Sequence, residues 1–161
     1  MFEHIDARFE SACRLIEILC AIMLAVMTGI IALLVTTRNF LGFSFSWSEE
    51  LTRYLLIWLS LLGATVLTKR DDHIRFDFLA ERLPALPLRL ISITLRLLVL
   101  GFLWILVEQS WAVAQSRAST HSPALGLSMV VPYLAIPVSA ALMLVATALN
   151  IWRDLRLLRR G

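Results

Sequence analysis

Few side chains in this 161-residue sequence have types and spacings that could carry out chemistry. Cys13 and Cys20 are seven residues apart, which fits neither a metal site nor a disulfide in a reducing compartment. His73 lies four residues before Asp77, so a hydrogen bond between them could stabilise a helical turn, but no further ligands accompany them to hold a metal. The sequence has no glycine-rich phosphate loop and no nucleophile paired with a base. We therefore predict a protein without enzymatic activity, cofactor or bound metal.

Glu49, Glu50 and Arg53 form a group of charges at the start of an apolar stretch. The 15 residues between Arg53 and Lys69 carry no charge. As a helix they span roughly 22 Å, less than the hydrocarbon core of about 30 Å. The helix must therefore extend back toward Trp47, which puts the three charges at or just inside one membrane interface. Two interpretations stay open: capping of the helix by the acidic pair, or contact with another protein outside the membrane.

The overall composition indicates a membrane protein. With 59% hydrophobic residues and a mean hydropathy of +0.79, the sequence is too apolar for a soluble domain of this length. Four apolar segments are long enough to cross a membrane as helices. We place these spans at about residues 15–37, 48–68, 88–109 and 131–152. The sequence thus predicts an all-α membrane protein with four transmembrane helices in a single integral domain.

The 15 Lys and Arg residues are unevenly distributed along the chain. Eleven of them lie in three clusters: before the first span, between the second and third spans, and after the fourth. Under the positive-inside rule these three segments are cytoplasmic, so both termini face the cytoplasm and the two other connections face outward. The net charge of +3 is therefore explained by membrane topology, and we expect no nucleic-acid partner.

The connection between the second and third spans contains an amphipathic segment at about residues 74–83. Its apolar side chains recur at helical spacing: Phe76, Leu79, Ala80 and Leu83. We predict a helix on the cytoplasmic membrane surface here, because one face can rest on lipid while the acidic residues turn toward water. In the third span, Arg96 follows Arg89 by seven residues and lies on a similar face. Two interpretations of these arginines stay open: contact with membrane phospholipids, or contact with another subunit.

Two features of the spans indicate contacts between helices. Ser60, Gly63 and Ala64 give the second span a small face that another helix could approach closely. Glu108 lies twelve residues after Arg96, too far along the helix to pair with it, and at the level of Arg53. We therefore predict an Arg53–Glu108 ion pair between the second and third spans.

The segment from Trp47 to Leu79 closely resembles the signature of the small membrane subunit of tripartite ATP-independent periplasmic (TRAP) transporters, the DctQ type. The resemblance extends over nearly the whole chain and agrees with its length and its four predicted spans. The matching positions are Trp47, Glu49, Glu50, Arg53, Trp58, Gly63, Ala64, Arg70, His73, Ile74 and Asp77, with Pro123, Leu125, Gly126, Tyr133, Ile136 and Pro137 downstream.

This resemblance implies a non-catalytic subunit of a sodium-coupled secondary transporter in the bacterial inner membrane. In that family a larger membrane subunit carries the substrate and sodium sites, and a periplasmic binding protein delivers the substrate, often an organic acid. The chain would brace the larger subunit and help dock the binding protein. The candidate residues for assembly or docking are Trp47, Glu49, Glu50, Arg53, Trp58, Gly63, Ala64 and Glu108. Those that would shape the cytoplasmic turn are Arg70, His73 and Asp77.

Two other functions stay open from the sequence. A small autonomous four-helix, proton-coupled exporter would use Glu17 as its proton carrier. This residue lies at the edge of a span beside Arg14, however, where we expect it to be solvated. A structural subunit of another membrane complex is the second alternative. Transport assays separate these functions, because a scaffolding subunit moves no solute by itself.

Overall fold

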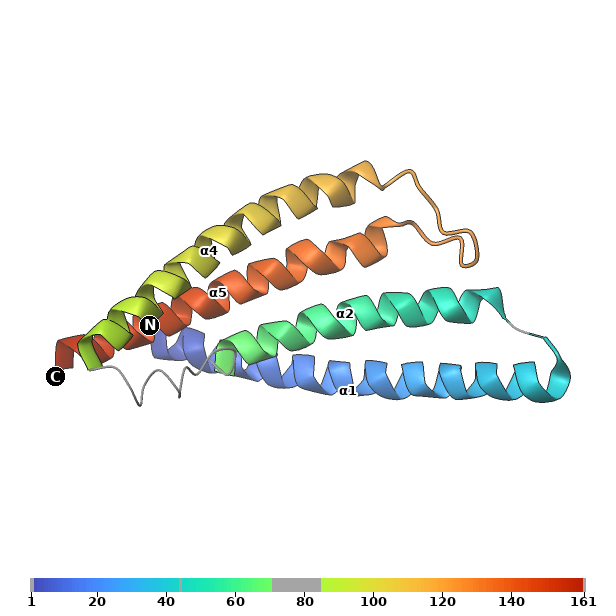
Figure 1. Cartoon of the computed structure of the whole chain (residues 1–161), viewed down its shortest axis with the longest axis horizontal. Coiled ribbons are helices and arrows are strands. Elements are labelled where there is room, and N and C mark those ends of the chain that lie inside the picture. Colours follow the sequence, from blue (N-terminus) through green and yellow to red (C-terminus); the bar gives the residue numbers. More distant parts are fainter. Residues whose placement is uncertain (1, 44, 71–84, 161) are drawn as a thin grey trace.

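The computed structural model describes residues 2–43, 45–70 and 85–160, with only the backbone path given for residues 2–8, 85–90, 92 and 153–160. This part of the chain forms four helices (Figure 1). They are α1 (Phe2–Leu41), α2 (Ser46–Arg70), α4 (Ala85–Ser116) and α5 (Val130–Arg160). Each contains a stretch long and apolar enough to cross a membrane, which confirms the prediction of an all-helical chain with four such segments. The predicted surface helix at 74–83, with His73 and Asp77, lies outside the described residues.

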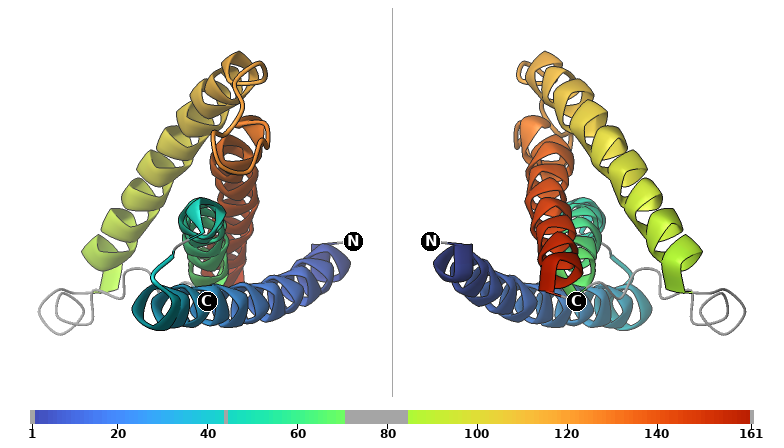
Figure 2. Two further views of the ribbon diagram at one scale, coloured as in Figure 1. Left: turned by 90° about the vertical axis from the view of Figure 1, so that its right-hand side faces the viewer. Right: turned by 90° about the vertical axis from the view of Figure 1, so that its left-hand side faces the viewer.

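The four helices form an open row in the order α1, α2, α5, α4. The helix pairs in substantial contact are α1 with α2, α2 with α5, and α5 with α4. Figure 1 shows this order from bottom to top, and Figure 2 shows α4 leaning away from the other helices. The last helix of the chain is therefore inserted between the second and third of the described helices. Consequently α1 and α4 stand at the two ends of the row, each with one side covered.

The contact between α1 and α2 follows a regular repeat. The less exposed positions of α1 are three and four residues apart in alternation, the spacing by which two helices interlock over many turns. They are Cys13, Ile16, Cys20, Met23, Met27, Ile30, Leu34 and Thr37. Both cysteines are free thiols of this seam, and the thiol of Cys20 lies 3.9 Å from the carbonyl oxygen of Leu59.

The contact between α2 and α5 includes polar links at three levels. The indole N–H of Trp58 donates to the carbonyl of Val131 (3.2 Å), near the start of α5. Farther along, the Thr65 hydroxyl lies 3.4 Å from the Ser139 carbonyl and is fully buried. The third link, from the Asn150 amide to the carbonyl of Thr68 (2.8 Å), is near the other end of α2. Hydrogen bonds of this kind fix the register of two helices in a medium where water cannot compete.

The small face predicted on α2 is open at Gly63. Gly63 and Ala64 are half-buried, and a Cβ added at Gly63 would meet nothing within 4 Å in the described part of the chain. The links to α5 run along other positions of α2, Trp58, Thr65 and Thr68. A close helix contact at Gly63 thus stays a prediction that concerns another protein.

Candidate functional site at the hairpin end

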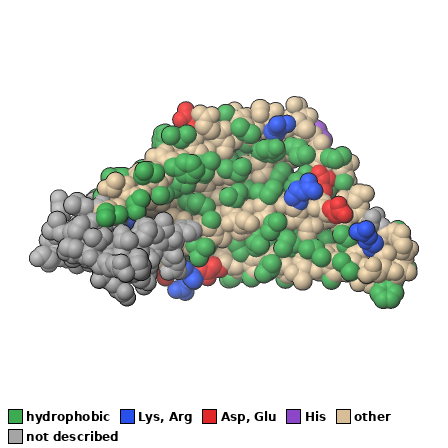
Figure 3. Space-filling view, in the orientation of Figure 1, with side chains coloured by type: hydrophobic (Ala, Val, Ile, Leu, Met, Phe, Trp, Pro, Cys, Tyr) green, Lys and Arg blue, Asp and Glu red, His purple; other side chains and the backbone are tan. Residues whose placement is uncertain are grey.

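The chain reverses direction twice at one end of the row, between α1 and α2 and between α4 and α5 (right in Figure 1). We call this end the hairpin end, and residues 117–129 the α4–α5 turn. Figure 3 shows many apolar side chains along the described helices, with several basic and acidic side chains at the hairpin end. The predicted docking residues Trp47, Glu49, Glu50 and Arg53 belong to the first two turns of α2 and lie here.

Glu50 links α2 to the α4–α5 turn. One carboxylate oxygen accepts hydrogen bonds from the backbone N–H groups of Ala124 (3.1 Å) and Leu125 (3.2 Å). The other accepts a hydrogen bond from the hydroxyl of Tyr54, one helical turn later (2.6 Å). Hydrogen bonds to an ionised carboxylate are stronger than those between neutral groups. The side chain of Glu50 therefore ties the two hairpins together.

The α4–α5 turn is folded so that it can present two neighbouring N–H groups to Glu50. An antiparallel bridge closes it, and the N–H of Ser122 donates to the carbonyl of Leu127 (2.8 Å). Gly126 has a φ of +67°, a left-handed conformation that glycine adopts without the steric cost of a side chain. The buried Ser122 hydroxyl also accepts a hydrogen bond from the Leu125 N–H (3.1 Å). Glycine at position 126 is thus required by the same turn that engages Glu50.

Two further contacts hold the turn on the helices. The hydroxyl of Tyr54 lies 3.5 Å from the sulfur of Met129, at the end of the turn. The guanidinium of Arg117, at its start, lies 5.7 Å from the ring centroid of Tyr133 in the first turn of α5. Both ends of the turn are therefore fixed by side-chain contacts as well as by its own backbone.

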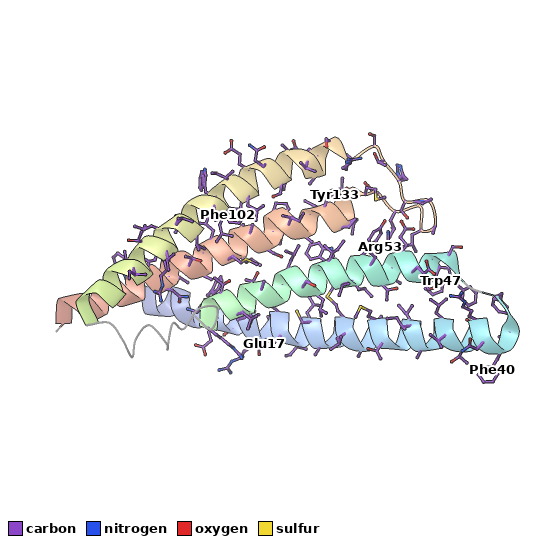
Figure 4. The ribbon with its side chains drawn as sticks, viewed as in Figure 1. Glu17, Phe40, Trp47, Arg53, Phe102 and Tyr133 are labelled. Carbon is purple, nitrogen blue, oxygen red and sulfur yellow. The ribbon has the colours of Figure 1, made fainter. Side chains whose placement is uncertain are left out.

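The other charged residues predicted for this end are exposed. Glu49 and Arg53 lie on the surface of α2, and Figure 4 shows Arg53 and Trp47 near the hairpin end of that helix. Trp47 is 37% exposed and packs against Phe45, with ring centroids 5.8 Å apart. Of the acidic pair, Glu49 is thus available to another protein, whereas the carboxylate of Glu50 is engaged within the chain.

The predicted Arg53–Glu108 ion pair is wrong for this chain by itself. Both side chains are exposed, and they form no ion pair with each other. The reason is the order of the helices, because α5 lies between α2, which carries Arg53, and α4, which carries Glu108. The positions of Arg53 and Glu108 in their spans predicted the same depth in the membrane for both charges. They did not reveal that α5 lies between the two helices.

At the opposite end, the partner of Glu17 differs from the residue beside which it was expected. Its partly exposed carboxylate forms an ion pair with Arg70, in the last turn of α2, and not with Arg14. Arg14 pairs instead with Glu10, one turn earlier (3.7 Å). Figure 4 shows Glu17 where α1 passes the end of α2. Arg70 therefore joins the first two helices, and the carboxylate proposed as a proton carrier is held by a cation.

Of the two arginines predicted to contact phospholipids or another subunit, Arg89 and Arg96, the structure describes the side chain of Arg96. Arg96 lies half-buried on α4, and the side chain of Arg89 is outside the described side chains. Within the described residues, no group of three or more His, Cys, Asp or Glu side chains could hold a metal ion. The described side chains of the hairpin end are linked by hydrogen bonds and include exposed charges.

Comparison with known proteins identifies the family. The family described as "Tripartite ATP-independent periplasmic transporters, DctQ component" matches residues 27–157. The chain belongs to the DctQ family. This small permease subunit is therefore a multi-pass membrane protein of a TRAP transporter, with a role in transport rather than in enzymatic catalysis. The resemblance seen in the sequence around Trp47–Leu79 is confirmed.

Individual relatives agree with this assignment. The DctQ-type chain is 31% identical over 129 residues to a putative TRAP transporter small permease protein of Haemophilus influenzae, covering 80% of each protein. It is 25% identical over 142 residues to the sialic acid TRAP transporter small permease protein SiaQ of Vibrio cholerae, covering 88% of this chain and 82% of SiaQ. It is also 35% identical over 104 residues to the isethionate TRAP transporter permease protein DctMQ of Oleidesulfovibrio alaskensis, covering 62% of this chain and 16% of that longer protein.

Proposed function

We propose that this DctQ-type subunit braces the large permease of a sodium-coupled TRAP transporter for an organic acid and helps dock the periplasmic binding protein. The observation that carries this proposal is the open row of apolar helices. Its end helices α1 and α4 have large exposed apolar side chains along their length, such as Ile22, Leu33, Leu98 and Ile105. A bracing subunit needs such surfaces, because one side must meet another membrane protein while the rest meets lipid.

The match to a longer permease protein supports the partner in this proposal. The relative DctMQ is a single permease protein, and this chain corresponds to only 16% of its length. A small-subunit sequence within a larger permease chain favours direct association of the small and large subunits. We therefore take the large permease as the membrane partner, in a heterodimer.

The charge distribution supports the orientation. Lys and Arg residues cluster at the N-terminus, between α2 and α4, and at the C-terminus, which favours a cytoplasmic position for all three segments. The hairpin end would then face the periplasm of a bacterial inner membrane and meet the binding protein. The proposed surface helix at 74–83 and the arginines at 89 and 96 would lie at the cytoplasmic side, where phospholipid headgroups are within reach.

Reconstitution in liposomes tests the function. The small subunit, the large permease and the binding protein are combined with a sodium gradient, and uptake of labelled organic acids is measured with each component omitted in turn. We expect uptake only when all three are present, and none from the small subunit alone. Solute movement by the purified small subunit, or full uptake without it, contradicts the proposal.

Labelling of single cysteines tests the orientation separately. In a variant without Cys13 and Cys20, a cysteine replaces either Ser119 in the α4–α5 turn or Gly161 at the C-terminus. A membrane-impermeant maleimide added to intact spheroplasts should label position 119 and should reach position 161 only after lysis. The reverse pattern overturns the proposed orientation and leaves the family assignment unchanged.

A further inference from the structure

Helix α4 has two regular stripes of side chains on opposite sides. The first contains Leu103, Ser110 and Ala114, which are buried, and covers the side that faces the rest of the row. The second stripe is exposed throughout and consists of Leu98, Gly101, Ile105, Glu108 and Ala112. Its members are separated by three and four residues in alternation, the repeat with which one helix packs along another. We call this second set the exposed stripe of α4.

The exposed stripe has a carboxylate well inside the candidate span. The apolar stretch of α4 runs from Ile93 to Ser116, and Glu108 lies eight residues before its end. At the rise of an α-helix this is about 12 Å from the helix end. Glu108 forms no ion pair or hydrogen bond with the described part of the chain. Ionisable groups at such positions normally face a protein partner rather than hydrocarbon, because acyl chains offer no hydrogen-bond donor.

The shape of the exposed stripe suits another helix. A Cβ added at Gly101 would meet nothing within 4 Å, so a neighbouring backbone can approach closely there. The side chains of Leu98 and Ile105, on either side of this glycine, are 66% and 60% exposed. Figure 4 shows the nearby Phe102 on α4. A small residue between large apolar ones, followed by a single acid, forms a surface that can be complemented in both shape and charge.

We infer that the exposed stripe of α4 packs against a transmembrane helix of the large permease that presents a Lys, Arg or neutral hydrogen-bond donor to Glu108. This inference rests on the proposed function for the identity of the partner. The longer relative supports the choice, since a sequence like this one is part of a larger permease chain there. A second copy of this chain fits less well, because a symmetric parallel contact on the stripe would bring two Glu108 carboxylates together.

The other end of the row presents a different surface. The exposed side of α1 has no charged residue between Ile18 and Thr37, so lipid alone satisfies it. Its Gly29 is also open, with nothing within 4 Å of an added Cβ. This glycine is a matched control for Gly101, because both lie in exposed, apolar helix surfaces and differ in the stripe to which they belong.

Co-purification with the large permease tests the inference. The variants G101L, E108Q and the control G29L are expressed with a tagged large permease, and the recovered small subunit is measured against its amount in the membrane. We expect G101L and E108Q to lower recovery by about fivefold to tenfold, a typical size for the loss of an interhelical contact. We expect G29L to remain at the level of the original chain. Equal recovery of all three variants overturns the inference.

A photo-crosslinking amino acid gives a readout that does not depend on stability. It is placed at Ile105 on the exposed stripe or at Ile22 on α1, and adducts are identified by mass spectrometry. We expect an adduct with a helix of the large permease from position 105 and lipid adducts from position 22. Adducts of position 105 only with lipid or with a second copy of the chain overturn the inference.

These experiments separate the inference from the proposed function. If the original chain neither co-purifies with the large permease nor is needed for uptake, the proposed function fails. If it does both, yet G101L and E108Q co-purify fully and position 105 gives no permease adduct, the function stands. In that case the interface lies on another surface.

Discussion

At the scale of single residues, Glu50 shows how a membrane protein can use a carboxylate as a structural acceptor. Its oxygens receive hydrogen bonds from two backbone N–H groups of the α4–α5 turn and from Tyr54. The neighbouring Glu49 is exposed, so adjacent acids in the sequence have different tasks. Glu49, Arg53 and the surface of the turn are therefore the parts of this end that are open to a partner, with Glu50 holding the turn in place.

Replacement of Glu50 by Gln tests this anchoring task. The amide keeps an acceptor oxygen but loses the negative charge that strengthens the hydrogen bonds from Ala124 and Leu125. We expect hydrogen exchange at these two backbone amides to become about tenfold faster, because local opening of the turn is easier. The exposed E49Q is the matched control and should leave their exchange unchanged. Unchanged exchange in E50Q as well would show that the α4–α5 turn is stabilised by its own backbone hydrogen bonds and not by the charge of Glu50.

The sequence identified Glu50 as important but could not reveal its partners. The partners are backbone N–H groups 74 and 75 residues away, and a backbone group has no residue type to recognise. The signal available in the sequence was the glycine at position 126, because glycine is typical of tight turns. The structure shows that this glycine has a positive φ. The predicted partner of Arg53 failed for a related reason, because residue types and depth do not specify which helices are neighbours.

At the scale of helices, α5 provides the contacts that join the two hairpins. The Asn150 amide donates to the carbonyl of Thr68, which joins the last turn of α2 to α5. The replacement N150A should destabilise the helical fold in detergent by about 0.5–1 kcal/mol, the usual value of an interhelical hydrogen bond in membranes. Thermal unfolding followed by circular dichroism measures this change. The exposed A148S, on the same helix, is the control, and a loss as large in A148S would contradict the assignment.

The ion pair between Glu17 and Arg70 joins α1 to the end of α2. Its side chains are 37% and 58% exposed, so solvent screens the pair and its contribution to stability is about 0–1 kcal/mol. We expect E17Q to support uptake by the reconstituted three-component transporter at nearly the original rate, because Glu17 joins helices and does not transfer protons. A loss of uptake in E17Q, with assembly intact, would restore the proton-carrier interpretation. The exposed variant E10Q serves as control.

The helices themselves were predictable, whereas their order was not. Each candidate span is a helix long enough to cross a membrane and contains an apolar window, so hydropathy and the charges between spans identify it. The order α1, α2, α5, α4 depends on small and polar side chains such as Ala135, Ser139 and Asn150, which are buried in α5. Such residues occur on many helix surfaces. A surface of this kind becomes an interface only where a neighbouring helix, here α2 or α4, has side chains that fit it.

At the scale of the whole molecule, an open row has a thermodynamic consequence. A closed bundle covers each helix on two sides, but α1 and α4 each pack against one neighbour in substantial contact. Membrane helices are stabilised by packing against other helices. Because α4 packs against one neighbour in the chain, a partner protein could stabilise it further. This arrangement suits a subunit that is completed by a larger protein, and it predicts that complex formation stabilises the small subunit.

This stabilisation can be measured as the midpoint of thermal unfolding of the small subunit, alone and with the large permease. A partner that binds only the folded form adds about 2.7 kcal/mol when present at 100 times its dissociation constant. We expect a clear upward shift of the midpoint for the original chain and for G29L. The shift should be much smaller for G101L, because the added side chain keeps a neighbouring helix from the exposed stripe of α4. An equal shift for G101L would mean that the permease stabilises the row through α1 or through the hairpin end.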